Sequence, residues 1–240
     1  MGMDRDGWLS LLAEAVGTFL FFFVGAGSIL ATAGVITGNP GTADLVAVAL
    51  AHGLVLAVLV SSFGAISGAH FNPAVTFGVW LVGRISTMRA IWYVWAQLVG
   101  ALAAGLALLL VFGEGGRRLA LGAPGLSAGV SPVAGIAIEA ILTMVLLFAV
   151  FGTAIDPRAP KLGGFAIGLA VAADILVGGP LTGAAMNPAR WFGPAVVAGA
   201  FTDWYVWWIG PLLGAGIAGL IYRYLLPAAD LARQPASPDA

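Results

Sequence analysis

Long apolar runs, separated by short polar breaks, extend through most of the chain. A helix needs roughly 20 apolar residues to cross about 30 Å of hydrocarbon. Six runs reach or nearly reach that length, and they cover about 8–31, 44–63, 85–112, 132–154, 162–179 and 204–226. This pattern predicts an all-α membrane protein with six transmembrane helices.

Two shorter apolar runs, 73–82 and 188–198, remain. At ~1.5 Å per residue each run would reach only about 15 Å, or half the membrane. Half-length helices at matching places in two halves are typical of re-entrant segments in an inverted repeat. We therefore expect a single transmembrane domain over residues 1–240, with a first repeat over about 8–112 and a second over about 132–226.

Each short run follows a copy of one twelve-residue motif. Residues 67–78 read SGAHFNPAVTFG and residues 182–193 read TGAAMNPARWFG, with seven positions identical at an offset of 115. Asparagine is a favoured N-cap and proline is favoured at the first helical position. The motif therefore predicts a helix start in each copy. These starts are formed by Asn72, Pro73, Ala74, Asn187, Pro188 and Ala189.

The composition agrees with a membrane protein and excludes several functions. Hydrophobic residues make up 60% of the chain and charged residues only 9%, against about 25% charged in soluble domains; the mean hydropathy is +1.02. A net charge of −1 offers no basic surface for nucleic acid, and the lack of cysteine removes thiol chemistry. His52 and His70 have no paired carboxylates nearby in sequence. We therefore expect no metal site, no cofactor and no enzymatic activity.

The distribution of basic residues predicts the orientation. With a cytoplasmic N-terminus, the other side of the membrane holds only Arg117 and Arg118. The cytoplasmic side then holds Arg5, Arg84, Arg89, Arg158, Lys161, Arg223 and Arg233. Both termini are expected in the cytoplasm of a cell-membrane protein, with residues 227–240 as a disordered tail.

The paired asparagines suggest a chemistry for the place where the half-helices meet. Because each repeat has an odd number of spans, the half-helices enter from opposite faces and their N-termini meet near the midplane. An N-cap asparagine accepts a backbone N–H through its oxygen and leaves its amide NH₂ free to donate. Water between Asn72 and Asn187 must turn both lone pairs toward the protein. It then cannot accept from a neighbouring water, and two positive helix ends repel cations.

Four of the charged residues in the predicted membrane segments require an explanation. Arg190 follows the second motif where the first copy has Val75, and we favour a pore-lining arginine over a salt bridge with Glu139 or Asp174. Glu14 and Glu139 occupy equivalent places in the two repeats. A proton relay is the alternative, but their symmetry favours structural support of the re-entrant loops through backbone N–H groups. Asp174 could orient a pore group, pair with Arg190 or reach the interface.

Two further patterns concern packing. The spans contain recurring glycines, which suit close helix approach. An aromatic cluster predicts an interfacial belt, and it consists of Trp204, Tyr205, Trp207 and Trp208.

These residues together resemble the aquaporin or major intrinsic protein family over almost the whole chain. The two motifs, the paired glutamates and the sequence Trp208-Ile-Gly-Pro211 carry the resemblance. It implies a homotetramer in which each protomer holds its own pore. It also implies passive, two-way flow of water or small neutral solutes.

By spacing from the motifs, the family's aromatic/arginine selectivity filter corresponds to His52, Ile175, Ala184 and Arg190. This set is similar to the filter of plant tonoplast intrinsic proteins and of the ammonia-permeable mammalian aquaporin. The glycerol-channel signature is absent, because Trp191 follows the arginine where that signature has Asp. Isoleucine removes a hydrogen-bonding group from the filter wall and Ala184 leaves room. The resemblance thus implies a channel for water with ammonia as its second solute.

The same residues leave other functions open. A broader facilitator for urea, hydrogen peroxide or glycerol is one alternative, and a secondary transporter is another, because inverted repeats and broken helices occur there too. Coupled transport needs a titratable or ion-binding group at the midplane, whereas the meeting point offers amides and helix N-termini. A membrane enzyme has less support, and a structural junction protein would need a plugged pore. We expect a channel whose partners are water, small neutral solutes and membrane lipid.

Overall fold

The computed structural model describes residues 5–38, 41–158, 160 and 162–225. Its described residues contain eight α-helices and no strand: α1 (Arg5–Thr32), α2 (Leu45–Ser67), α3 (Pro73–Leu81), α4 (Thr87–Arg118), α5 (Pro132–Val150), α6 (Gly164–Thr182), α7 (Pro188–Ala198) and α8 (Val206–Leu225). Two short elements are a 3₁₀ turn η1 (Ala120–Gly122) and a π-helix η2 (Phe151–Ile155). The predicted tail lies outside the described residues.

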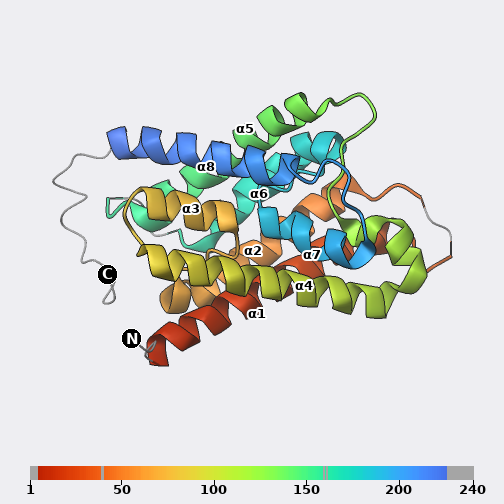
Figure 1. Ribbon diagram of the computed structural model, residues 1–240, viewed down its shortest axis with the longest axis horizontal. Helices are drawn as coiled ribbons and strands as arrows, with labels where there is room; N and C mark the ends of the chain where they lie inside the picture. Colours follow the sequence, from red (N-terminus) through yellow and green to blue (C-terminus); the bar gives the residue numbers. More distant parts are fainter. Residues whose placement is uncertain (1–4, 39–40, 159, 161, 226–240) are drawn as a thin grey trace.

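The long helices form one bundle, and the short helices α3 and α7 lie within it (Figure 1). Six helices of the described chain are long and apolar enough to cross a membrane, and they correspond to the six predicted spans. Helix α1 begins and α8 ends at the same end of the bundle (Figure 1). We call this end the termini side.

Glycine ends the two helices that lead into the motifs. Helices α2 and α6 run to Ser67 and Thr182, beyond the predicted ends at 63 and 179. The next residues, Gly68 and Gly183, have φ angles of 83° and 81°. Only glycine adopts this left-handed conformation without steric cost, so it turns the chain out of the helix. Apolar content falls before the helix ends, and the prediction was therefore short.

The helices cross at points where glycine brings two backbones together. A methyl group at Gly100 of α4 would overlap the carbonyl oxygen of Ala15 in α1. The equivalent crossing in the second repeat places Gly214 of α8 against the carbonyl oxygen of Ala140 in α5. These contacts confirm the predicted packing role at those glycines. The two repeats thus use the same crossing, as an inverted duplication requires.

The predicted aromatic belt is wrong for one member of the cluster. Trp204 is 52% exposed, but Trp207 is only 1% exposed and donates its Nε1–H to the carbonyl oxygen of Thr182 at 3.0 Å. The ring of Trp207 also stacks on Trp191, with centroids 6.0 Å apart and an interplanar angle of 5°. This cluster position therefore supports the second motif and does not mark the membrane surface.

Candidate functional site

Both half-helices begin as the motif predicts. The Oδ1 atom of Asn72 accepts the backbone N–H of Ala74 at 2.8 Å, and that of Asn187 accepts the N–H of Ala189 at 3.0 Å. Proline occupies the first turn of α3 and of α7. The two helices therefore direct their capped, positive ends toward each other near the centre of the bundle.

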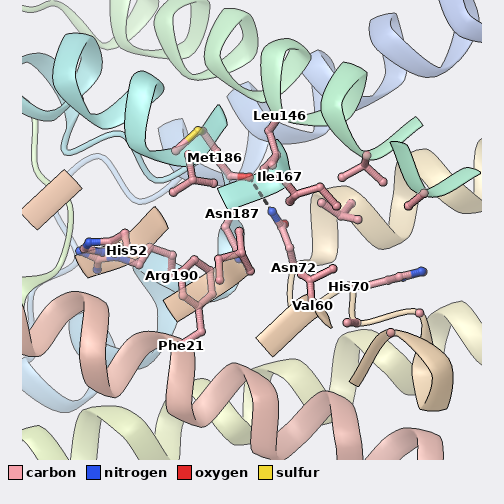
Figure 2. Close-up of a pocket in the computed structure, with 18 of the residues that line it drawn as sticks. Phe21, His52, Val60, His70, Asn72, Leu146, Ile167, Met186, Asn187 and Arg190 are labelled. Atoms are coloured by element: carbon pink, nitrogen blue, oxygen red, sulfur yellow. Dashed lines mark hydrogen bonds between the residues drawn. The ribbon is translucent and has the colours of Figure 1, made fainter. Parts of the chain in front are cut away.

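The asparagine amides join the two repeats. Asn72 donates from Nδ2 to the carbonyl oxygen of Met186 at 2.9 Å (Figure 2). Asn187 donates from Nδ2 to the carbonyl oxygen of Phe71, also at 2.9 Å. The prediction that each amide NH₂ is wholly free is therefore wrong, because one of its two hydrogens is used within the protein. The second hydrogen of each amide remains available to the cavity that both residues line.

The loops that precede the half-helices hold a strained backbone. Four residues other than glycine have positive φ angles between 44° and 53°: Ala69, Phe71, Ala184 and Met186. Such conformations cost on the order of 1 kcal/mol or more each and persist only where surrounding contacts fix them. In this chain the contacts come from two buried glutamates.

Glu14 fixes the first loop. Its Oε1 atom accepts the hydroxyl of Ser67 at 2.7 Å and the backbone N–H of His70 at 2.9 Å. Its Oε2 atom accepts the N–H of Phe71 and the side-chain amide of Gln97, both at 2.8 Å. All four hydrogen bonds end on a side chain with no solvent exposure, so the carboxylate is satisfied by its own loop.

Glu139 fixes the second loop in the same way. Its Oε1 atom accepts the hydroxyl of Thr182 at 2.6 Å and the N–H of Ala185 at 2.9 Å, while Oε2 accepts the N–H of Met186 at 2.7 Å. These bonds match the structural support expected for the paired glutamates. They leave the carboxylate oxygens occupied by loop donors, which gives no geometric basis for a proton relay.

Sequence reasoning missed Gln97, described above, and four further residues of this support. Ser67 and Thr182 open the two motif copies and bond to the glutamates. Tyr93 donates its hydroxyl to the carbonyl oxygen of Ser67, just as Trp207 donates to that of Thr182. The hydroxyl pair could have been found, because a Ser and a Thr begin the repeated motif. Tyr93 and Trp207 differ in type and gave no such signal.

His52 and Arg190 contact each other across the predicted filter (Figure 2). Arg190 donates its Nε–H to Nε2 of His52 at 3.3 Å. Since arginine can only donate, His52 Nε2 is the acceptor, and Nδ1 carries the hydrogen that bonds the carbonyl oxygen of Val48 at 2.9 Å. Gly25 gives the imidazole its space, because a methyl group there would lie 2.6 Å from the ring.

The guanidinium of Arg190 is directed at the pore and not at an acid. The described ion pairs include none with Glu139 or Asp174, so the alternative of a salt bridge is wrong. Its Nη1 atom is buried and has no hydrogen-bond partner among the described residues. The side chain is only 3% exposed, yet it lines the cavity that holds both asparagines, so its charge lies beside that space.

The four predicted filter residues line one cavity of about 370 Å³, which we call the pore cavity. Three of them, His52, Ile175 and Arg190, also line a second cavity of about 430 Å³ on the side away from the termini. The filter thus stands at the junction of the two cavities. Ala184 faces the pore cavity beside them, with 3% exposure.

The pore cavity continues from the filter to the termini side. His52 and Arg190 lie at one end of the view in Figure 2, the asparagines lie in the middle, and His70 lies beyond them. Apolar side chains form much of the wall, among them Val60, Leu146 and Ile167. At the termini side the π-helix η2 contributes Thr153, Ala154 and Ile155. The site is therefore a passage with mainly apolar walls and polar groups at two levels.

Trp191 and Asp174, whose roles the sequence did not determine, lie outside this passage. Trp191, next to the filter arginine in sequence, is 4% exposed and packs on Trp207 and Phe201, so its bulk does not reach the pore. Asp174 is 4% exposed and its Oδ2 atom has no described hydrogen-bond partner. Of the three roles considered for Asp174, pairing with Arg190 and exposure at the interface are both wrong.

Comparisons with known proteins agree on one family. The family model described as Major intrinsic protein matches residues 3–222. Aquaporin TIP4-4 from Zea mays is 49% identical over 224 residues, covering 91% of this chain and 87% of the relative. Probable aquaporin TIP3-2 from Arabidopsis thaliana is 44% identical, covering 98% and 92%. The X-ray structure of the aquaglyceroporin from Plasmodium falciparum has a TM-score of 0.79 at 23% identity, covering 90% and 96%, and thus shares the fold.

Proposed function

The chain belongs to the major intrinsic protein family, and we propose that it conducts water passively, with ammonia as its second solute, while excluding protons and cations. Membership in this family of aquaporin channels implies passive transport of water and small solutes by a multi-pass membrane protein. The observation that carries the finer proposal is one cavity lined by both asparagines and all four filter residues.

The asparagine pair supports proton exclusion. Each amide has one hydrogen bound to the opposite loop, and this bond fixes the direction of the other hydrogen. Water between Asn72 and Asn187 therefore meets two oriented donors and two positive helix ends. With both lone pairs turned to the protein, this water cannot accept a proton from its neighbour. The buried charge of Arg190 adds a second barrier to cations at the filter.

The filter supports ammonia as a second solute. Ile175 adds an apolar surface to the cavity that His52 and Arg190 line, and Ala184 is small. Arginine has donors only, so a neutral ammonia molecule accepts a hydrogen bond from Arg190, which lines the same cavity. An apolar wall lowers the competition from water for such a donor. The proposal of ammonia is thus supported by an apolar side chain, Ile175, that offers no hydrogen bond, and by an arginine, Arg190, that can only donate.

We further propose a homotetramer in the cell membrane, with both termini in the cytoplasm. Arg84 and Arg89 lie between α3 and the first turns of α4 on the termini side, whereas Arg117 and Arg118 lie at the other end of α4. This asymmetry of basic residues supports the orientation. Lipid and three further copies of the chain would then cover the exposed apolar faces of the bundle.

Stopped-flow light scattering tests the water proposal. Vesicles that contain the protein should shrink faster under an osmotic gradient than protein-free vesicles of the same lipid. Equal rates would contradict the proposal.

An imposed ammonia gradient tests the second solute. The lumen, reported by a pH-sensitive dye, should become alkaline faster with the protein than without it. Ile175→His should lower the ammonia flux severalfold more than the water flux, because it narrows the filter and adds a hydrogen-bonding group. Ile175→Val is the matched control and should keep the ratio. An unchanged ratio in the histidine variant would count against the filter assignment.

A further inference from the structure

An apolar groove runs along the outside of the bundle, away from the passage. Its volume is about 400 Å³, and we call it the outer groove. The wall that α4 contributes consists of Thr87, Ala90, Ile91, Val94 and Trp95, which recur at helical spacing and so form one stripe. None of these five residues lines the pore cavity. The outer groove is therefore a separate feature, which water conduction as proposed above does not use.

Helix α3 forms the floor of the outer groove, and α4 and α8 form its walls. The half-helix lies between the two long helices and contacts both (Figure 1). Its groove residues Pro73 and Thr76 are buried, whereas Ile91 and Trp95 on α4 are 47% and 61% exposed. The groove therefore opens sideways. Because α4 and α8 are membrane-spanning helices, it faces either the hydrocarbon of the membrane or a neighbouring copy of the chain.

The outer groove follows the helices through one leaflet. It starts at Thr87, the first residue of α4 on the termini side, and reaches Pro73, where α3 begins near the centre of the bundle. At ~1.5 Å per residue the α4 stripe extends about 12 Å, close to the roughly 15 Å of half a membrane. A lipid acyl chain takes the same direction through a leaflet.

The wall of the outer groove offers an occupant mainly carbon. Two hydroxyls line it, and both accept a hydrogen bond within the protein. Thr87 accepts from Nε1 of Trp80 at 3.0 Å, and Thr76 accepts from Nε2 of Gln97 at 2.9 Å. Water would find few partners here, and apolar cavities stay dry. A hydrocarbon chain has no polar group to satisfy, so it enters without that cost.

The second repeat fills the equivalent place with its own side chains. The motif offset of 115 pairs Thr76 with Trp191. The glycines at the two equivalent helix crossings are 114 apart, and this offset pairs Thr87 with Phe201. The rings of Trp191 and Phe201 contact each other, with centroids 6.3 Å apart. Where the second repeat has two large rings in contact, the first has two threonines and an open groove, which indicates that apolar material fills this place.

We propose that the outer groove binds one acyl chain of a phospholipid from the termini-side leaflet. A volume of about 400 Å³ over a length of about 12 Å gives a cross-section of roughly 30 Å². A helix about 10 Å across needs roughly 80 Å². A helix of a neighbouring copy is therefore too wide for the groove, whereas a single hydrocarbon chain is slender enough.

The floor of the outer groove lies close to the passage. Nδ1 of His70 is 3.1 Å from the hydroxyl oxygen of Thr76, and His70 lines the pore cavity. One pair of side chains thus separates a bound acyl chain from the passage. Binding of the chain does not depend on which solutes the passage conducts.

Photolabelling of the full-length protein in phosphatidylcholine vesicles tests the proposal. The probe is phosphatidylcholine with a diazirine at the end of one acyl chain, and peptide mass spectrometry locates the label. Leu212 lines the groove and is half-buried, whereas its neighbour Leu213 is 49% exposed and does not line it. Exposure alone would favour label on Leu213. Binding in the groove should instead place at least twice as much label on Leu212.

A variant that fills the groove should reduce this label. Ala90→Phe adds a ring to the α4 wall, so label on Leu212 of α8 should fall threefold or more. Ala103→Phe is the matched control, because Ala103 is exposed on the same helix and lies outside the groove. Unchanged label on Leu212 in Ala90→Phe would overturn the proposal. So would wild-type label on Leu213 that equals or exceeds the label on Leu212.

Cross-linking tests for a neighbouring copy of the chain in the same place. The chain has no cysteine, so Ala90→Cys introduces a single thiol at the groove. Covalent dimers formed by a short bismaleimide, together with no lipid label on Leu212, would assign the groove to a second copy and overturn the proposal. Gel filtration checks that each variant is folded. If Ala90→Phe fails to fold, Ala90→Leu replaces it and should lower the label at least twofold.

Discussion

Arg190 distinguishes the two halves of the pore at the residue scale. Its counterpart in the first repeat is Val75, so the duplication supplies a charge on one side of the asparagines only. Its contact with His52 at 3.3 Å holds the guanidinium at the wall of the pore cavity. The asparagines act on every permeating molecule alike, whereas this asymmetric pair is the place where solutes can be told apart.

Replacement of Arg190 by valine, the residue of the first repeat, should weaken the barrier to cations. A unit charge at about 4 Å contributes ~4 kcal/mol at an effective dielectric constant near 20. Proton conductance should therefore rise by about tenfold or more, while water permeability stays within a few-fold of wild type. A pH-sensitive dye in vesicles under a potassium diffusion potential measures the change. Arg117→Val serves as control, and a proton conductance equal to wild type would contradict the role assigned to the charge.

Individual residues also show which features of the site could be predicted from the sequence. The repeated motif identified Asn72 and Asn187, because a pattern that occurs twice is hard to explain by chance. It did not reveal the contact between His52 and Arg190, which are 138 residues apart and come from different repeats. Trp207 was misplaced for a related reason. An indole suits both the membrane surface and a buried hydrogen bond, and only packing decides which it adopts.

At the element scale, the helix crossings determine where the residues of the site lie. Glycine at the α1–α4 and α5–α8 crossings removes the side chain that would separate the backbones. Glu14 lies on α1 and Glu139 on α5, so these crossings fix the position of the carboxylates that hold the loops. Close approach is thus a condition for the strained loop conformation, and its effect reaches the pore through the glutamates.

Gly214→Ala should destabilise the protein. The added methyl would overlap the carbonyl oxygen of Ala140, and overpacking of this kind costs typically 1–3 kcal/mol. Gly216→Ala on the same helix is the control, because its methyl would lie 3.6 Å from Phe77, in ordinary contact. Thermal unfolding in detergent should show a lower midpoint for the first variant only. Equal midpoints would mean that α5 and α8 can move apart without a loss of stability.

The π-helix η2 forms the termini-side mouth and has an anchor of its own. The carbonyl oxygen of Phe151 accepts the N–H of Asp156 at 2.8 Å and the hydroxyl of Tyr222 at 3.0 Å. Tyr222 also lies 3.0 Å from Oδ2 of Asp156, whose carboxylate holds Arg158. This network ties the end of η2 to α8. The sequence predicted helix over 132–154 but not the wider turn, because periodicity cannot separate a π-helix from an α-helix.

The Arg158 side chain beside Asp156 holds the pKa of that carboxyl below its ordinary value of 3.8. A depressed folded pKa stabilises the fold above the unfolded pKa, and this contribution is lost as the pH falls through the folded value. Asp156→Asn should therefore lower the unfolding midpoint by a constant amount between about pH 5 and pH 8. The difference from wild type should shrink below about pH 4. A pH series of thermal unfolding curves measures this, and a difference that persists unchanged at pH 3 would contradict it.

The whole molecule is a pair of inverted repeats that share one passage. The six spans and two half-helices were predictable because apolar length and the duplicated motif are properties of the sequence itself. The width of the passage could not be predicted from the sequence, because it depends on which side chains face inward where distant helices cross. Ile175 and Ala184 were placed in the filter by spacing, and their exposure to the pore cavity comes only from the three-dimensional structure.

A passive passage between inverted repeats should conduct equally in both directions. Osmotic shrinkage and swelling of the same vesicles should give equal permeability coefficients, and flow should rise linearly with the gradient. Stopped-flow measurements with reversed gradients test this, and protein-free vesicles serve as control. Saturation of flow, or dependence on a proton gradient, would instead favour the secondary transporter considered from the sequence.

The exchange of hydrogen bonds between the asparagines and the opposite loops has a consequence for biosynthesis. The amide of Asn72 reaches its acceptor, Met186, only after 114 further residues have been made. At roughly 5–20 residues per second a ribosome needs on the order of ten seconds for that stretch. During this interval the first repeat is inserted with its central loop incomplete. The passage therefore closes around its centre only when the last third of the chain arrives, so a nascent or truncated half lacks the assembled asparagine pair.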